Sequence, residues 1–189
     1  LLERVVWQAG KFLHGEDGFL VNRRRLALQK VFAQKYPNAD IFTFDFEDQG
    51  AIEDVRRAVA ACEEGLFAAQ KMVIFLHPFE LDETAEKLLL NFLENFTRKE
   101  AKEITLLFVH PDKIKKTHPL ARFLIKHADK TEVFSKLQPK DTAAFILREL
   151  NLIDARARFA PAALRLFSDS VGTDTARIIT ELEKLAAFK

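Results

Sequence analysis

Short apolar stretches alternate with segments of helical periodicity along the first 138 residues of the chain. The apolar stretches predict five strands, at Lys11–His14, Asp40–Phe46, Met72–His77, Ile104–His110 and Glu132–Leu137. Two of them, Met72–His77 and Ile104–His110, are apolar on both faces, which is typical of inner strands of a parallel sheet. Asp40–Phe46 instead alternates, with three Phe side chains on one side, so we expect one strongly buried face near a sheet edge.

Apolar residues recur every three or four positions between the predicted strands, as in helices that pack on a sheet. This spacing predicts helices at Phe19–Tyr36, Ala51–Glu63, Pro119–Ala128 and over the residues that follow Asp82, which is a good N-cap. Strands that alternate with helices indicate an α/β fold with a parallel sheet covered on both sides. Such sheets bind ligands outside the carboxyl ends of their strands.

The pattern changes at Gln138–Asp141, because only helical periodicity follows it. Three apolar stripes are present in this last segment, with Pro161 suited to a helix start and Gly172 to a helix end. We therefore predict an α/β domain over residues 1–138 and a three-helix domain over residues 139–189.

Composition narrows the class of protein without identifying it. The 29 basic residues nearly cancel the 28 acidic ones in this 189-residue chain, and a net charge of +1 does not indicate a DNA-coating protein. The single cysteine, Cys62, excludes a disulfide within the chain and fits the cytoplasm. Neither a signal peptide nor an apolar stretch long enough to cross a bilayer is present, so we expect no membrane partner.

Three local motifs carry a resemblance to a known family. They are Phe12–Val21 (FLHGEDGFLV), Gly65–Ile74 (GLFAAQKMVI) and Gly172–Arg177 (GTDTAR). In this order and spacing the chain resembles the bacterial DNA polymerase III delta subunit of the clamp loader. The resemblance implies an AAA+-like five-stranded parallel sheet flanked by helices, followed by a small three-helix lid domain. Family members carry a further helical collar domain, which we expect this chain to lack.

The sequence departs from a working nucleotide site in two places. A P-loop needs Gly-x-x-x-x-Gly-Lys-Ser/Thr between the first strand and its helix, but His14–Leu20 contains neither the Lys nor the hydroxyl. Glu16 and Asp17 would also repel a polyphosphate. The strand at Met72–His77 ends in His and Pro where an acidic pair would hold magnesium. We therefore predict no cofactor and no catalytic residue.

Two histidines, His77 and His110, stand at the ends of predicted strands, where a metal or catalytic role is conceivable. Neither has a carboxylate or third ligand at a recognisable spacing. Each is followed by Pro, which terminates strands, so we predict a structural role and no metal site.

Leu66 and Phe67 follow a predicted helix and precede a strand. In the delta family a hydrophobic pair at this position inserts into the peptide-binding pocket of the beta sliding clamp, so the resemblance implies clamp binding by Leu66 and Phe67. The residues alone allow a second interpretation, in which both side chains pack beneath the helix end.

Several cations remain open to more than one interpretation. Arg23 and Arg24 lie on the first predicted helix and could contact DNA phosphates, or could belong to a solvated charged face. Arg177 falls where AAA+ lids place an arginine that senses nucleotide. Without a P-loop we expect it to form an ion pair or to contact a neighbouring subunit.

The resemblance implies a non-catalytic subunit of the DNA polymerase III holoenzyme, a DNA-directed DNA polymerase complex. Its expected partners are the beta sliding clamp, the delta-prime and gamma/tau loader subunits, and primed DNA within the assembled loader. One alternative is a divergent AAA+ protein that binds ATP. The other is a different clamp-loader subunit, either delta-prime-like or a motor. Motor subunits carry zinc-binding cysteines and a Ser-Arg-Cys motif, which a chain with Cys62 alone lacks.

Overall fold

The structure is a computed structural model, and it describes residues 10–47, 52–63, 70–96 and 104–188. The chain forms two compact units, which divide between Phe134 and Ser135. Each unit is described by itself below.

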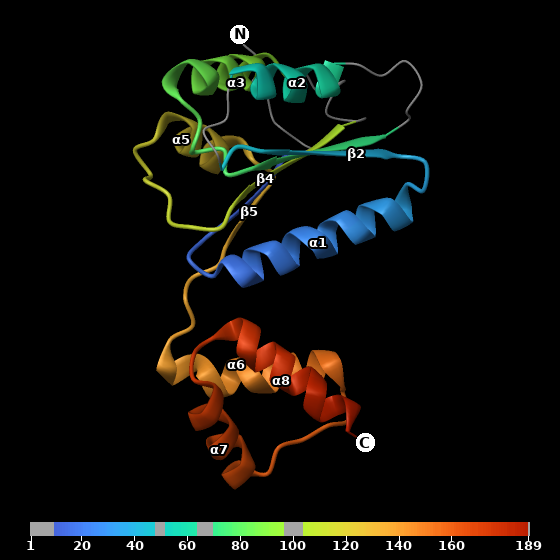
Figure 1. The fold of residues 1–189 in the computed structure, drawn as a ribbon, viewed down its shortest axis with the longest axis vertical. Helices are drawn as coiled ribbons and strands as arrows, with labels where there is room; N and C mark the ends of the chain where they lie inside the picture. Colours follow the sequence, from blue (N-terminus) through green and yellow to red (C-terminus); the bar gives the residue numbers. More distant parts are fainter. Residues whose placement is uncertain (1–9, 48–51, 64–69, 97–103, 189) are drawn as a thin grey trace. The chain divides into compact units, whose positions relative to one another are not determined.

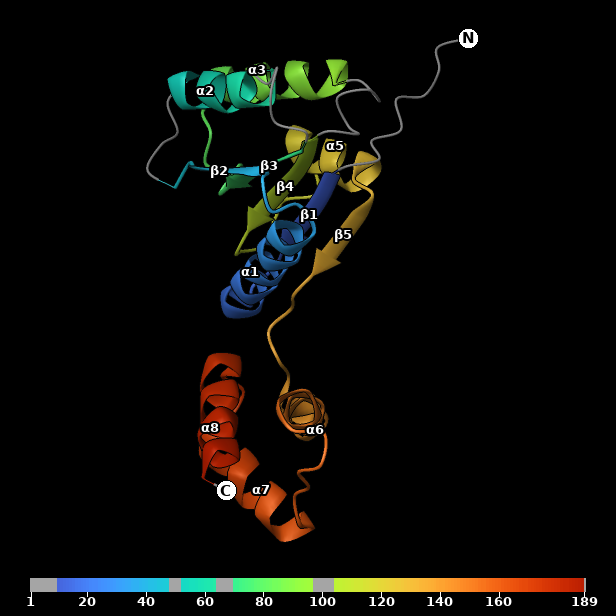
Figure 2. The same ribbon diagram turned by 90° about the vertical axis from the view of Figure 1, so that its right-hand side faces the viewer.

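The first unit is built on a five-stranded parallel sheet. In chain order its strands are β1 (Gly10–His14), β2 (Asp40–Asp45), β3 (Lys71–Leu76), β4 (Ile104–His110) and β5 (Lys130–Val133). They lie side by side in the order β2-β3-β4-β1-β5, and every neighbouring pair is parallel (Figures 1 and 2). The register aligns His14 of β1 with His110 of β4, so the carboxyl ends of the strands meet at one edge.

Helices cover both faces of this sheet, as the alternation of strands and helices predicts. One face carries α1 (Gly18–Lys35), and the other carries α2 (Ile52–Glu63), α3 (Glu83–Asn95) and α5 (Pro119–His127) (Figure 1). Within the described residues, no helix is both long and apolar enough to cross a bilayer.

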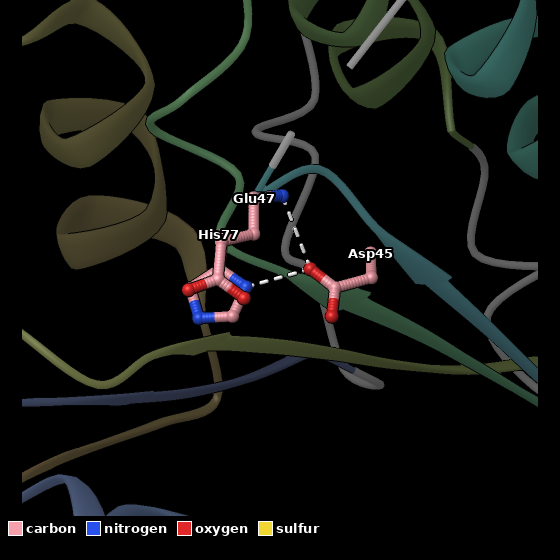
Figure 3. A group of neighbouring side chains, drawn as sticks. All are labelled: Asp45, Glu47 and His77. Atoms are coloured by element: carbon pink, nitrogen blue, oxygen red, sulfur yellow. Dashed lines mark hydrogen bonds and ion pairs between the residues drawn. The ribbon is translucent and has the colours of Figure 1, made fainter. Parts of the chain in front are cut away.

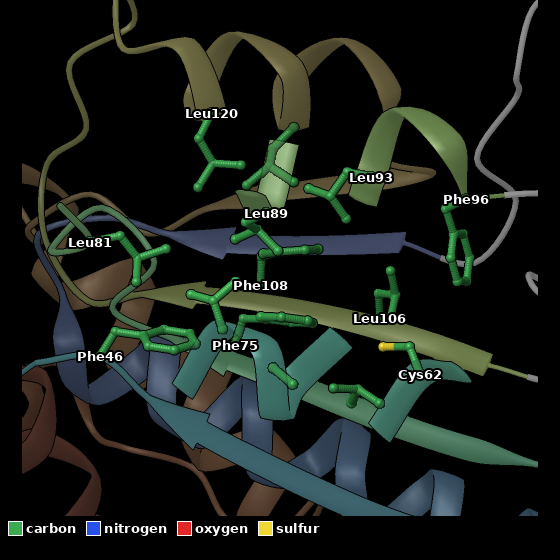
Figure 4. Packing of buried hydrophobic residues seen from close by; sticks show 14 of the residues in the cluster. Phe46, Cys62, Phe75, Leu81, Leu89, Leu93, Phe96, Leu106, Phe108 and Leu120 are labelled. Atoms are coloured by element: carbon green, nitrogen blue, oxygen red, sulfur yellow. The ribbon is translucent and has the colours of Figure 1, made fainter. Parts of the chain in front are cut away.

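The alternation of side chains along the inner strands produces two cores. On the side of α2, α3 and α5, the ring of Phe75 stacks on that of Phe108 with centroids 4.6 Å apart (Figure 4). On the side of α1, Ile74 and Leu107 pack with Val21 of that helix. Because the inner parts of β3 and β4 are buried on both sides, Val73–Leu76 and Leu106–Val109 are apolar throughout.

Side-chain caps fix where several helices begin. Asp17 accepts a hydrogen bond from the Leu20 N–H at 3.0 Å at the start of α1. Asp82 accepts from the N–H groups of Thr84 and Ala85 at the start of α3, both at 2.8 Å. These carboxylates satisfy N–H groups that have no partner inside the helix.

The second unit consists of helices, as predicted. A short 3-10 turn, η1 (Pro139–Asp141), leads into α6 (Thr142–Ile153), and α7 (Pro161–Val171) and α8 (Thr175–Ala187) follow. Pro161 opens α7, and Gly172, with a φ of 65°, ends it. Buried apolar side chains from all three helices form its core, including Ile146, Val171 and Ile178.

Both edge strands differ from the sequence prediction. β2 lies at an edge of the sheet, as expected, but its predicted buried face does not extend to Phe42, which is 36% exposed, whereas Phe46 just beyond the strand is fully buried. As an edge strand, β2 has a strand neighbour on one side only. The last strand lies at Lys130–Val133 and not at Glu132–Leu137, because β5 pairs with β1 through a polar sequence that gives no apolar signal.

Candidate functional site

The turn between β1 and α1 occupies the place of a nucleotide-binding loop, and its N–H groups are engaged within the protein. The Gly15 N–H donates to the carbonyl oxygen of His110 at 3.2 Å, and the Asp17 N–H donates to that of Phe134 at 3.0 Å. In a P-loop such N–H groups point at the phosphates. Here neither of these two N–H groups is directed at a free anion position.

The segment that follows β5 closes over this turn. The Phe134 N–H donates to the His14 carbonyl oxygen at 2.8 Å, which holds Phe134 against the turn. A Cβ atom added to Gly15 would lie 2.1 Å from the Phe134 oxygen, and the φ of Gly15 is 141°. Backbone therefore meets backbone at this point, and only a glycine fits.

Carboxylates occupy the start of α1, where a helix attracts anions. Asp17 is 8% exposed and caps the helix through Leu20. The Glu16 carboxylate pairs with the Nζ atom of Lys113 at 2.9 Å. The positive end of the helix is thus compensated by side chains of the chain itself.

At the neighbouring strand ends, the structure brings together three side chains that the sequence analysis did not connect. The His77 Nδ1 atom lies 2.6 Å from the Asp45 Oδ1 atom, and the Glu47 N–H donates to the same oxygen at 3.1 Å (Figure 3). One ligand-type atom from each of Asp45, Glu47 and His77 lies within 4.8 Å of the others. The spacing of these residues along the chain gave no sign of this contact. Asp45 stands 32 positions away in sequence and meets His77 because β2 and β3 are adjacent.

Hydrogen bonding keeps the Asp45 carboxyl ionised. Partial burial alone would raise its pKa, but hydrogen bonds from His77 and from backbone N–H groups outweigh burial and lower the pKa. Asp45 is consequently an anion at the edge of the sheet.

The other histidines at this edge are packed among aromatic rings. His14 and His110 are 8% and 5% exposed, and burial lowers the pKa of both. The Phe79 ring packs edge-on against two imidazoles, and its centroid lies 4.9 Å from that of His110 and 5.2 Å from that of His118. The His110 Nδ1 atom has no hydrogen-bond partner among the described residues. Neutral imidazoles in such surroundings fit the structural role predicted for His110.

Arg24 is engaged inside the first unit. Its guanidinium forms a bidentate pair with the Glu132 carboxylate, with Nε at 3.0 Å and a terminal nitrogen at 2.9 Å. This pair ties α1 to β5, the strand that precedes the closing Phe134. The neighbouring Arg23 is half-buried on the same helix.

Arg177 lies in the first turn of α8 in the second unit. Its side chain is exposed, and its backbone N–H donates to the Asp174 Oδ1 atom at 3.0 Å. The predicted clamp-binding pair, Leu66 and Phe67, lies outside the described residues, in the segment between the end of α2 and the start of β3.

Neither a family model nor a curated protein sequence matches the chain. The chain is similar in structure to a DNA clamp loader delta protein from Bacillus subtilis, at 17% identity and a TM-score of 0.65, over 96% of this chain and 53% of that one. A RuvB variant from Thermotoga maritima matches at 14% identity and a TM-score of 0.57, over 95% of this chain and 54% of that one. A DNA polymerase III gamma subunit-related protein from the same organism matches at 15% identity and a TM-score of 0.55, over 95% of this chain and 54% of that one.

The chain thus spans about half the length of each of these proteins. At these identities the likeness concerns the fold. The fold expected from the sequence, an AAA+-like parallel five-stranded sheet flanked by helices and followed by a three-helix unit, is confirmed: the chain has the fold shared by this clamp-loader delta protein, RuvB and the gamma subunit-related protein.

Proposed function

We propose that the chain is a clamp-loader delta subunit, which binds a sliding clamp and does not itself hydrolyse ATP. In this proposal it acts in DNA replication as one member of a loader complex, with an α/β domain over residues 1–138 and a lid domain over residues 139–189. Its fold is that of a clamp loader delta protein, and its three sequence motifs resemble the same family.

The closed turn between β1 and α1 is the observation that carries the proposal. A nucleotide in this position would have to displace Phe134 and break the hydrogen bonds that Gly15 and Asp17 donate to carbonyl oxygens. It would also approach the Glu16 and Asp17 carboxylates. Both effects oppose phosphate binding, which favours an interaction subunit over an ATPase.

The clamp contact is assigned to Leu66 and Phe67 on the basis of the family resemblance. Burying a large aliphatic and an aromatic side chain in an apolar pocket contributes roughly 3–6 kcal/mol before the entropy costs of association. If the pair binds an easily opened clamp conformation more tightly, the population shifts towards that conformation. In this scheme the other loader subunits, delta-prime and gamma/tau, supply the energy of ATP hydrolysis, and primed DNA binds the assembled loader.

Binding of the chain to its cognate sliding clamp tests the proposal. The parent is compared with a Leu66→Ala/Phe67→Ala variant and with a control variant, Leu26→Ala/Val31→Ala, which removes two apolar side chains that are 51% and 61% exposed on α1. We expect the Leu66→Ala/Phe67→Ala variant to lose about 100-fold or more in affinity, equivalent to about 2.7 kcal/mol, and the control to bind like the parent. Thermal unfolding verifies that each variant is folded.

Two results would contradict the proposal. Absence of clamp binding by the folded parent would remove the delta assignment for this chain. Equal binding by the parent and the Leu66→Ala/Phe67→Ala variant would exclude this pair as the clamp contact, although the clamp would remain the partner.

A second candidate is another clamp-loader subunit, such as a delta-prime-like protein. The likeness to the gamma subunit-related protein supports it. This candidate predicts binding to other loader subunits without direct binding to the clamp, so the same experiment separates the two.

A further inference from the structure

Asp45, Glu47 and His77 form a compact group at the carboxyl ends of two adjacent strands. Asp45 is the last residue of β2, and His77 directly follows β3. The His77 Nδ1 and Asp45 Oδ1 atoms are 2.6 Å apart, and all three side chains offer ligand atoms within 4.8 Å of one another (Figure 3). Bonds of about 2.0–2.2 Å to a tetrahedral metal place ligand atoms roughly 3–3.5 Å apart. Small side-chain movements would therefore convert this group into a coordination sphere.

The backbone holds the group in place from both strands. The His77 N–H donates to the Val109 oxygen at 3.0 Å, and the His77 oxygen accepts from the Glu80 N–H at 3.0 Å. On the other strand, the Phe46 N–H donates to the Leu76 oxygen at 3.1 Å. Among the described residues, His77 is the non-glycine residue with a positive φ, of 51°. That conformation is uncommon for a side chain with a Cβ, and these bonds maintain it.

The charges around the group favour a cation. The Asp45 and Glu47 carboxylates form no ion pair with a lysine or arginine among the described residues. Glu80 and Asp112 act electrostatically on His110, whose ring lies against that of His77 with centroids 6.3 Å apart. Four carboxylates thus lie on or near this edge of the sheet, together with the imidazoles of His77 and His110.

We propose that Asp45, Glu47 and His77 bind a divalent transition-metal ion of the zinc and cobalt class, which ties the end of β2 to the end of β3. One imidazole nitrogen and two carboxylate oxygens suit these ions, whereas magnesium and calcium prefer oxygen alone. Three protein ligands leave a further coordination position for water or for an acidic group of another molecule. This site differs in place from the closed turn between β1 and α1, and it does not depend on the proposed clamp-loader role.

Titration of ZnCl2 and of CoCl2 into the tag-free chain tests the proposal, with calorimetry for zinc and visible absorption for cobalt. The site variants are His77→Asn, chosen because Asn tolerates a positive φ, and Asp45→Asn. The matched control is His127→Asn, which removes an imidazole at the end of α5. We expect one ion per chain, an affinity at least about tenfold weaker in each site variant, and a parent-like affinity in the control. Zinc should also raise the melting temperature of the parent more than that of His77→Asn.

The proposal is overturned if the parent binds neither ion saturably, or if His127→Asn weakens binding as much as His77→Asn does. It is equally overturned if the site variants bind like the parent. Should His77→Asn not fold, Glu47→Gln decides the question, because Glu47 is exposed and its carboxylate is not required for the strand pairing. Unchanged affinity in Glu47→Gln would then exclude the three-residue site.

Discussion

Replacing Gly15 by Ala should destabilise the first unit strongly, because the structure leaves no room for a side chain at this turn. The new Cβ would lie 2.1 Å from the Phe134 oxygen and 2.6 Å from its carbonyl carbon. Neither atom belongs to a flexible side chain, so the turn or the segment after β5 has to move. Gly15 also has a φ of 141°, a conformation that alanine rarely adopts.

The magnitude follows from the interactions that this movement disrupts. Backbone strain at such a conformation costs on the order of 1–3 kcal/mol. Displacement of Phe134 also breaks the bond that Asp17 donates to the Phe134 oxygen and the bond that Phe134 donates to the His14 oxygen, at about 0.5–1.5 kcal/mol each. Together these give a loss of about 2–6 kcal/mol, a large part of the stability of an ordinary domain.

Urea unfolding followed by far-ultraviolet circular dichroism measures this loss, and hydrogen exchange at β1 and β4 assigns it to the first unit. The matched control is Gly18→Ala, at the first residue of α1. Its Cβ would meet Pro111 Cβ at 3.3 Å, and Gly18 has no positive φ, so we expect a change within about 1 kcal/mol. If Gly15→Ala costs no more than Gly18→Ala, Phe134 does not close the turn and the reasoning fails.

Three further predictions concern the elements around the site. Glu132→Gln should lower the free energy of unfolding, measured with urea near neutral pH, by roughly 1 kcal/mol. The loss is small because Arg24 and Glu132 are only partly buried and water screens their attraction. An unchanged free energy of unfolding would show that the pair does not stabilise the fold. Although burial alone would raise the pKa of Glu132, hydrogen bonds from Arg24 and Lys130 lower this pKa below the usual value of 4.5. The contribution of the ion pair to the free energy of unfolding should therefore be complete above about pH 4.5 and disappear as the pH falls through the folded-state pKa. A parent whose stability has the same acid dependence as that of Glu132→Gln would refute this. Asp82→Ala should lower the free energy of unfolding by about 1 kcal/mol, because α3 loses its N-cap, and Phe75→Ala should lower it by about 3–5 kcal/mol, because a cavity forms in the core. Similar losses in the two variants would contradict the full burial of Phe75.

The sequence predicted the inner part of the sheet well and its edges less well. Inner strands β3 and β4 are buried on both sides, so their apolar runs are uninterrupted and their positions were predicted nearly to the residue. The edge strand β5 has the sequence KTEV, which carries no apolar period, and its position follows only from pairing with β1. Similarly, the exposure of Phe42 depends on the position of β2 in the sheet and not on its own sequence.

The sequence carries information about the site only where one local segment determines it. The missing Lys and hydroxyl after His14 are visible in the sequence, and they led to the prediction of a site that binds no nucleotide. The closure by Phe134 depends on a distant segment, as does the meeting of Asp45 with His77. A useful signal would have been the polar residues at the ends of strands predicted to be neighbours, because the carboxyl ends of parallel strands meet at one edge.

Titration of ATP into the chain by calorimetry, with and without Mg2+, tests most directly the central claim that this AAA+-like unit is closed to nucleotide. The account predicts no saturable binding, or a Kd weaker than about 1 mM, because the Gly15 and Asp17 N–H groups are bonded to backbone carbonyls and the Glu16 and Asp17 carboxylates would repel the phosphates. Saturable binding of one ATP per chain with a Kd in the range of about 1–10 μM would contradict the account and would favour a divergent ATP-binding protein.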